Sequence, residues 1–293
     1  TENKEYSSNN LIALIKQEKI FIGLVGILFI IAGLATPYAN IAMWVGFFFA
    51  GYSAIANDSI QTIGTFIASN SERPWWMLWL YMGGIFLITV SISWYLFDGD
   101  VSYQRLASKG FDETPSQFNF LQVAAPLFLL ILTRLRMPVS TTFLLLSSFA
   151  TSASSITGVL GKSLSGYFLA FALGFIVWFL VTRTFEKKFS ESKASNVWIP
   201  IQWITSGALW AVWLMQDAAN IAVYLPRSLS FMQFFGFAGT LVCGLGLLLY
   251  YKGGRIQKIV TEKSIVDDTR FATCVDFVYC IILFYFKLYS QVP

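Results

Sequence analysis

The sequence predicts an all-α polytopic membrane protein, and three observations support that prediction. The chain has 293 residues, 56% of them hydrophobic and only 12% charged, whereas about a quarter of the residues of a soluble domain are charged. Aromatic residues make up 17% and include 10 Trp, a residue enriched at membrane interfaces. About nine apolar stretches have the length that a helix needs to cross a bilayer. They lie at 20–36, 39–69, 75–97, 118–135, 138–160, 163–183, 199–225, 228–251 and 271–289.

Composition excludes several functional classes. The chain contains no histidine, which excludes imidazole metal ligands, Ser-His-Asp catalysis and histidine proton relays. Its three cysteines, Cys243, Cys274 and Cys280, have no CxxC spacing, so we expect small buried residues rather than a zinc site or disulfide framework. The net charge of +4 comes from short loops between apolar stretches and predicts no nucleic-acid partner.

The basic residues predict the orientation of the chain. If the N-terminal segment 1–19 lies in the cytosol, most Lys and Arg residues fall on the cytosolic side, including the basic loop 184–198. The longest loop on the other side, near 98–117, carries several acids. Cytosolic loops are enriched in Lys and Arg. We therefore expect a multi-pass protein of the cell membrane with a cytosolic N-terminus, in which Arg134 and Arg136 mark the membrane boundary.

Two apolar stretches contain an aspartate flanked by amides. In each, an amide precedes the aspartate and a second amide follows three residues later, on the same face of a helix. Ionised carboxylates at a helix centre cost ~3 kcal/mol on insertion scales and are usually functional. The two segments are Asn57-Asp58-Ser59-Ile60-Gln61 and Gln216-Asp217-Ala218-Ala219-Asn220.

The two segments predict an inverted repeat. Two apolar spans separate Asp58 from Pro138, and two separate Asp217 from Pro293; in the predicted topology the two Asp-bearing helices run in opposite directions. Inverted repeats with broken helices that meet near the midplane are typical of secondary transporters. The division is then 1–19, a first membrane part at 20–183 with the first repeat at about 39–160, the loop 184–198, and a second repeat at 199–293.

The second repeat stops at the position where the first continues with Val139-Ser140-Thr141-Thr142. We therefore expect the natural protein to continue beyond Pro293 with a Ser-Thr-Thr-like segment and at least one further span. The 293-residue chain alone is expected to carry anions poorly.

Two motifs resemble those of the inorganic phosphate transporter family, the sodium- or proton-coupled phosphate permeases, which has sulfate permease relatives. Ala56-Asn57-Asp58 with Gly64-Thr65 is similar to its Asn-Asp and Gly-Thr signature, and Pro138-Val139-Ser140-Thr141-Thr142 to its Pro-x-Ser-Thr-Thr signature. The chain departs from the family pattern at Gln61, Phe143, Gln216 and Tyr224-Leu225-Pro226. The resemblance covers about residues 40–293 and implies an inverted-repeat secondary transporter with broken or re-entrant helices.

The second motif predicts an anion site. Pro138 suits the first turn of a helix because proline lacks the N–H that would be unpaired there. The N–H groups of Val139, Ser140 and Thr141 would then face an anion with the helix dipole behind them, and Ser140, Thr141 and Thr142 add hydroxyl groups. These donors are neutral, so they can bind an anion without a salt bridge that would hold it.

The aspartates predict a coupling-cation site. Hard cations prefer oxygen ligands, and Asn57, Asp58, and Thr62 or Thr65 could hold sodium, with Asp217 and Asn220 as the symmetric site. A proton could replace sodium at either aspartate. Weaker candidates are Gln61, Gln216 and Asp276.

The sequence thus predicts a transporter of inorganic phosphate in the lipid bilayer, driven by a Na⁺ or H⁺ gradient and needing no other cofactor. A sulfate or other oxyanion permease is the alternative within the same fold, and a homodimer stays open. Two other classes are an anion channel and an intramembrane aspartyl protease. The protease lacks its expected Tyr-Asp and Gly-x-Gly-Asp motifs around Asp58 and Asp217, so we expect no enzyme.

Overall fold

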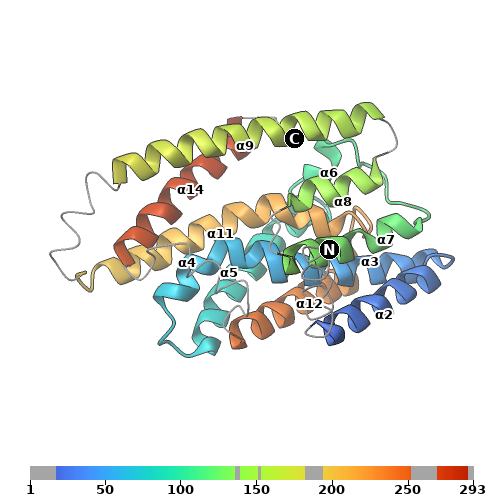
Figure 1. The fold of residues 1–293 in the computed structure, drawn as a ribbon, viewed down its shortest axis with the longest axis horizontal. Coiled ribbons are helices and arrows are strands. Elements are labelled where there is room, and N and C mark those ends of the chain that lie inside the picture. Colours follow the sequence, from blue (N-terminus) through green and yellow to red (C-terminus); the bar gives the residue numbers. More distant parts are fainter. Residues whose placement is uncertain (1–17, 136–138, 151–152, 182–193, 252–268, 290–293) are drawn as a thin grey trace, which may run out of the picture.

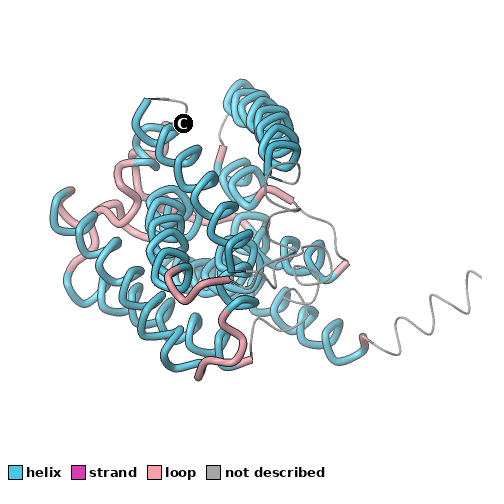
Figure 2. Tube along the Cα trace, turned by 90° about the vertical axis from the view of Figure 1, so that its left-hand side faces the viewer, coloured by secondary structure: helices cyan, strands magenta, loops and turns pink. Residues whose placement is uncertain are grey.

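The computed structural model describes residues 18–135, 139–150, 153–181, 194–251 and 269–289, and every regular element in these ranges is a helix (Figures 1 and 2). Three of the helical segments are long and apolar enough to cross a membrane: Ala39–Ser69, Trp75–Leu96 and Phe231–Tyr250. The all-α class is therefore confirmed for the described residues. Pro138, Pro293, Arg136 and most of the predicted basic loop lie outside them.

The helices follow one another along the chain with short connections. They are α2 (Lys19–Ala35), α3 (Ala39–Ala54), η1 (Ile55–Ser59), α4 (Ile60–Ser69), α5 (Trp75–Leu96), α6 (Arg105–Ser108), α7 (Phe120–Arg134), α8 (Thr141–Phe149), α9 (Ala153–Val181), α11 (Trp198–Ala222), α12 (Phe231–Tyr250) and α14 (Thr269–Tyr289).

The core forms where α5, α11 and α12 pack around the long segment 39–69. Phe47, Met82, Trp210 and Phe237 are fully buried there. The indole N–H of Trp210 donates to the carbonyl of Met82 at 3.0 Å, so this large ring fills the core without losing its hydrogen bond. Outward-facing side chains are largely apolar and exposed, for example Ile88 on α5 and Leu247 on α12. Such surfaces suit contact with lipid.

The segment 39–69 is one helix with a change of winding in the middle. α3 continues into η1, a π-helical turn of five residues, and then into α4. A π-helical turn amounts to one extra residue in an α-helix and is frequent at functional sites. Here the turn contains Asn57 and Asp58.

α7 and α8 form an antiparallel hairpin. Phe118, just before α7, contacts Phe149 at the end of α8, with ring centroids 6.2 Å apart, and both rings contact Tyr224. The turn between the helices lies instead beside the middle of the bundle, where Thr133 bonds to Asn57.

The hairpin corrects the predicted span at 138–160. α8 has nine residues and is therefore about 14 Å long, too short for the ~30 Å hydrocarbon core. The predicted stretches at 138–160 and 163–183 divide differently in the structure, into short α8 and the 29-residue helix α9. The polar residues at 150–155 interrupt the apolar run at the point where α8 ends.

A well-bonded loop closes the end of the bundle at which α6 lies, called the α6 end below. Arg227 follows α11 and donates to the carbonyls of Ala222, Val223 and Leu225. It also donates to the carbonyl of Phe111 at 2.7 Å. Cations near a helix C-terminus are favourable because the last carbonyls lack partners. Arg227 therefore joins the loop 98–119 to the end of α11.

Candidate functional site

The first aspartate lies in the π-helical turn, beside a firmly held amide. Asn57 Nδ2 donates to Asp58 Oδ1 at 2.5 Å. Asn57 Oδ1 accepts from Gln61 Nε2 at 3.0 Å and from Thr133 Oγ1 of α7 at 3.2 Å. Both hydrogen-bonding groups of the Asn57 amide are therefore engaged, and the amide orients the carboxylate of Asp58.

The second aspartate lies on α11, one helical turn before Asn220. Asn220 Nδ2 donates to Asp217 Oδ1 at 2.6 Å and to Thr142 Oγ1 of α8 at 3.0 Å. Asn220 is fully buried and Asp217 is 9% exposed. The second amide and aspartate thus connect α11 to the start of α8.

The start of α8 lies between the two aspartates, but it begins later than the sequence predicts. Ser140 is the N-cap residue, and its hydroxyl accepts from the N–H of Phe143 at 3.2 Å. The first helical N–H groups are therefore those of Thr141 and Thr142, and Val139 precedes the helix. The predicted donors at Val139 and Ser140 are displaced because the Ser140 hydroxyl caps the helix in the way that serine commonly does.

Four buried oxygen atoms at this place have no hydrogen-bond partner: Asp58 Oδ2, Thr141 Oγ1, Asp217 Oδ2 and Asn220 Oδ1. The hydroxyl of Thr141 faces the Asp58 carboxyl group, although their contact does not have the geometry of a full hydrogen bond. Asp58 also lies within electrostatic reach of Asp217. Buried polar atoms are normally paired, so this set of oxygens indicates a site for a cation or proton.

The remaining predicted residues lie close by but have other partners. The hydroxyl of Thr62 donates to the Asp58 backbone carbonyl at 3.1 Å. Thr65 donates to Asp276 Oδ1 at 2.8 Å, and Ser206 donates to Asp276 Oδ2. Gln216 Nε2 donates to the Leu283 carbonyl at 3.4 Å. Thr65 and Asp276 therefore belong to a second polar cluster that joins α4, α11 and α14.

Sequence reasoning missed several charged and polar partners. Thr133 bonds to Asn57, and its only signal was a hydroxyl at the end of an apolar stretch. Arg134, predicted to mark a membrane boundary, forms an ion pair with Glu18, and its guanidinium lies 4.8 Å from the centre of the Phe21 ring. Arg105 of α6 was predicted to lie in an outer loop, yet it acts electrostatically on Asp217.

Arg105 is held in an environment that is costly for a cation. Burial lowers the pKa of its guanidinium from the ordinary value, and the negative charge of Asp217 opposes that change. Its Nε is buried without a hydrogen-bond partner. Lys109 also acts on Asp217. The α6 end therefore supplies positive charge beside the second aspartate.

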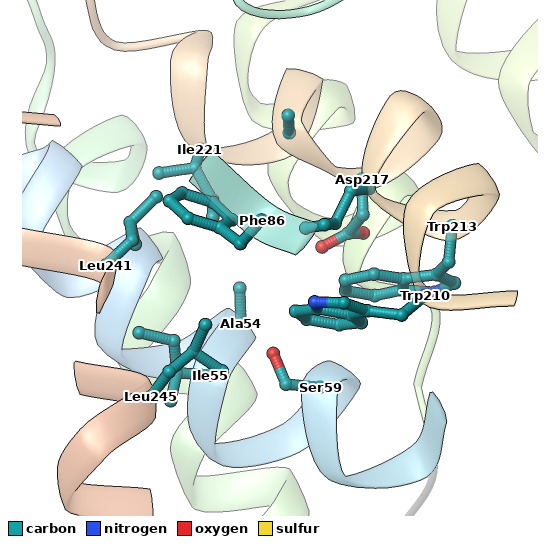
Figure 3. Close-up of a pocket in the computed structure, with 12 residues that line it drawn as sticks. Ala54, Ile55, Ser59, Phe86, Trp210, Trp213, Asp217, Ile221, Leu241 and Leu245 are labelled. Carbon is teal, nitrogen blue, oxygen red and sulfur yellow. The ribbon is translucent and has the colours of Figure 1, made fainter. Parts of the chain in front are cut away.

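A cavity adjoins Asp217 on the side facing the core (Figure 3). It has about 340 Å³ of empty space, counted to its open side. Figure 3 shows the carboxylate of Asp217 and the hydroxyl of Ser59 near one side, and the side chains of Leu241 and Leu245 at the other. Because apolar walls do not solvate a charge, a charge on Asp217 must be balanced by groups elsewhere in the site.

The chain matches no protein family model, no curated protein and no solved structure.

Proposed function

We propose that this protein is a secondary transporter of inorganic phosphate, driven by a sodium or proton gradient. The observation that carries the proposal is the set of four buried, unpartnered oxygens contributed by the two Asp-bearing helices and α8. Three of them belong to groups that can only accept at that atom, and the fourth is a hydroxyl. A bound cation or proton satisfies such a set.

The packing of the helices supports two inverted repeats around that site. α7 packs against α3, and α14 packs against α11. α5 packs against α11 as α12 packs against α3 and η1, and α5 and α12 pack against each other. These pairs are the ones that an exchange of the two repeats would interchange. The α7–α8 hairpin then corresponds to a re-entrant element with its turn near the midplane, where transporters of this kind bind substrate.

The anion is best placed at the start of α8. The N–H groups of Thr141 and Thr142 and the positive end of the helix dipole face the region between the aspartates. A dianion and two carboxylates cannot share a desolvated site without compensation. A cation at Asp58 or Asp217 provides that compensation, so the anion binds well only when the cation is present.

Phosphate suits this arrangement better than sulfate. Near neutral pH phosphate still carries a proton, so it can donate to a carboxylate while it accepts from hydroxyl and N–H groups. Sulfate can only accept and is repelled by an ionised carboxylate nearby.

Uptake of labelled phosphate by vesicles that contain the full-length protein tests the proposal. We expect uptake to require an inward gradient of sodium or protons and to saturate with phosphate. Asp58→Asn is expected to abolish gradient-driven uptake, and Asp98→Asn, the same change at an exposed loop residue, should leave it unchanged. Equal uptake by the wild-type protein and Asp58→Asn would remove Asp58 from the mechanism. Uptake that does not saturate and needs no gradient would indicate a channel.

A further inference from the structure

The inference concerns a basic cluster at the α6 end, defined as Arg105, Lys109 and Lys287. Arg105 and Lys109 flank the short helix α6, and Lys287 is near the end of α14. Lys287 Nζ lies 5.4 Å from the centre of the Tyr103 ring, two residues before Arg105. Arg105 and Lys287 lie within electrostatic reach of each other. Cations from two separate elements therefore converge beside α11.

The position of α6 is fixed by its surroundings. Leu106 is 1% exposed and belongs to the hydrophobic core. The hydroxyl of Tyr103 donates to the Thr89 carbonyl at 2.7 Å. Asp100 accepts from both Ser102 and Gln104 and so shapes the turn that precedes the helix. The chain thus brings the stem of Arg105 inside the protein rather than leaving it in solvent.

Burying this arginine has a cost that the visible contacts do not offset. Its Nε is a buried donor without a partner, and such a group costs ~1–3 kcal/mol. The facing carboxylates are Asp217 on α11 and, through its effect on Lys287, Asp100 in the loop. Asp100 already accepts three hydrogen bonds. Asp217 is therefore the main counter-charge of Arg105.

We propose that the basic cluster is an anion-binding site that is switched by the occupancy of Asp217. With Asp217 ionised and empty, Arg105 serves as its counter-charge. When a cation or proton occupies Asp217, the cluster has excess positive charge and a free donor, which bind a tetrahedral oxyanion such as inorganic phosphate. Arginine suits this role because its planar guanidinium binds phosphate through two parallel hydrogen bonds.

The switch rests on the proposed function and adds an order of events to it. The cation binds first and neutralises Asp217, the anion then binds at Arg105, and from there it reaches the start of α8 through the bond that links Asn220 to Thr142. Because the cluster lies on one side of the site, its loss should affect phosphate arriving from that side and not from the other.

Equilibrium binding of labelled inorganic phosphate to the purified full chain tests the switch without requiring transport. Ionic strength is kept constant with choline chloride, since exposed charges are screened by salt. Asp217→Asn imitates the neutralised state, so we expect this variant to bind phosphate without sodium. Adding Arg105→Gln to it should weaken binding about tenfold or more. Adding Arg73→Gln, the same change at the opposite end of the bundle, should have no effect.

Two results would overturn the switch. One is equal phosphate binding by Asp217→Asn and by the double variant with Arg105→Gln, when both variants remain folded by thermal unfolding in detergent. The other is no phosphate binding by Asp217→Asn. Failure of the proposed transport function is seen separately, as absence of gradient-driven uptake by the wild-type protein even though Asp217→Asn binds phosphate.

Discussion

At the scale of single residues, Thr141 connects the two parts of the proposed mechanism. Its hydroxyl faces the Asp58 carboxyl group and lacks a full hydrogen-bond partner, while its backbone N–H lies in the first turn of α8. One residue can therefore contact a cation through its side chain and an anion through its main chain. The sequence alone gave Thr141 only the second role.

Thr141→Val should separate these two roles. Valine has the shape of threonine without the hydroxyl, so the backbone donors at the start of α8 remain. We expect gradient-driven uptake to fall about tenfold or more, because loss of one hydrogen bond to a charged group costs ~1.5–3 kcal/mol. Thr141→Ser restores the hydroxyl and should recover most of the activity. Equal uptake rates for the valine and serine variants would show that the hydroxyl has no role.

Arg227 is a residue of the framework rather than of the site. Burial lowers its pKa to about 10, and the negative charges of Asp100 and Asp112 oppose that change. At neutral pH the guanidinium is therefore still charged, and it satisfies carbonyls at the end of α11 and in the facing loop.

Arg227→Met should destabilise the protein by about 3 kcal/mol, because it leaves several buried carbonyls without donors. Arg227→Lys keeps the charge but not the planar set of donors, and we expect an intermediate loss. The measurement is the midpoint of thermal unfolding in detergent. A midpoint for Arg227→Met within one degree of the wild type would mean that water replaces these bonds without cost.

At the scale of elements, the π-helical turn η1 determines how Asn57 and Asp58 are presented. A π-helical turn holds one extra residue relative to an α-helix, so the flanking helices α3 and α4 keep their own faces toward the core. Deleting Ala56 should convert the turn to regular α-helix while α3 and α4 still pack. We expect a folded protein without gradient-driven uptake.

Ala56→Ser, which preserves the length of the turn, is the control for that deletion and should retain uptake. Full uptake by the deletion variant would show that the π-helical winding is not required. An unfolded deletion variant would contradict the claim that the turn alone absorbs the extra residue.

The elements also show where sequence reasoning succeeds and where it stops. Apolar length identifies α5 and α12 almost to the residue, because crossing a membrane imposes that length. The same rule fails at 138–160, because the apolar run there is shared between α8, a break and α9. The polar interruption beside Asp58 could be seen in the sequence, but its π-helical winding could not, since no residue type specifies it.

The candidate site divides in the same way. The pairing of Asp217 with Asn220 follows from helical spacing and could be predicted, as could the proximity of Gln61 to Asn57. Contacts between distant segments, such as Thr133 with Asn57 or Thr65 with Asp276, depend on how helices pack. Arg105 was missed because a basic residue in a loop is normally solvated, and nothing in the sequence shows that α6 carries it inside.

At the scale of the whole molecule, substrate choice follows from the charges that surround the anion. Two carboxylates near the start of α8 favour an anion that can donate a proton. In competition experiments, we expect excess unlabelled phosphate to block labelled phosphate uptake and excess sulfate to have little effect. Block by sulfate but not by phosphate would assign the protein to a sulfate or related oxyanion permease.

The coupling between cation and anion is the central claim, and a binding measurement tests it most directly. If a cation at Asp58 or Asp217 prepares the site for phosphate, then sodium, or a lower pH if the proton is the coupling ion, must raise phosphate affinity, and phosphate must raise the affinity for that cation by the same factor. The measurement is the dissociation constant of labelled phosphate, determined at constant ionic strength across a sodium series and a pH series. The account predicts a change of about tenfold or more along one series, within the usual range of such couplings, and its loss in Asp58→Asn. A phosphate affinity that stays constant along both series in the wild-type protein would contradict the account.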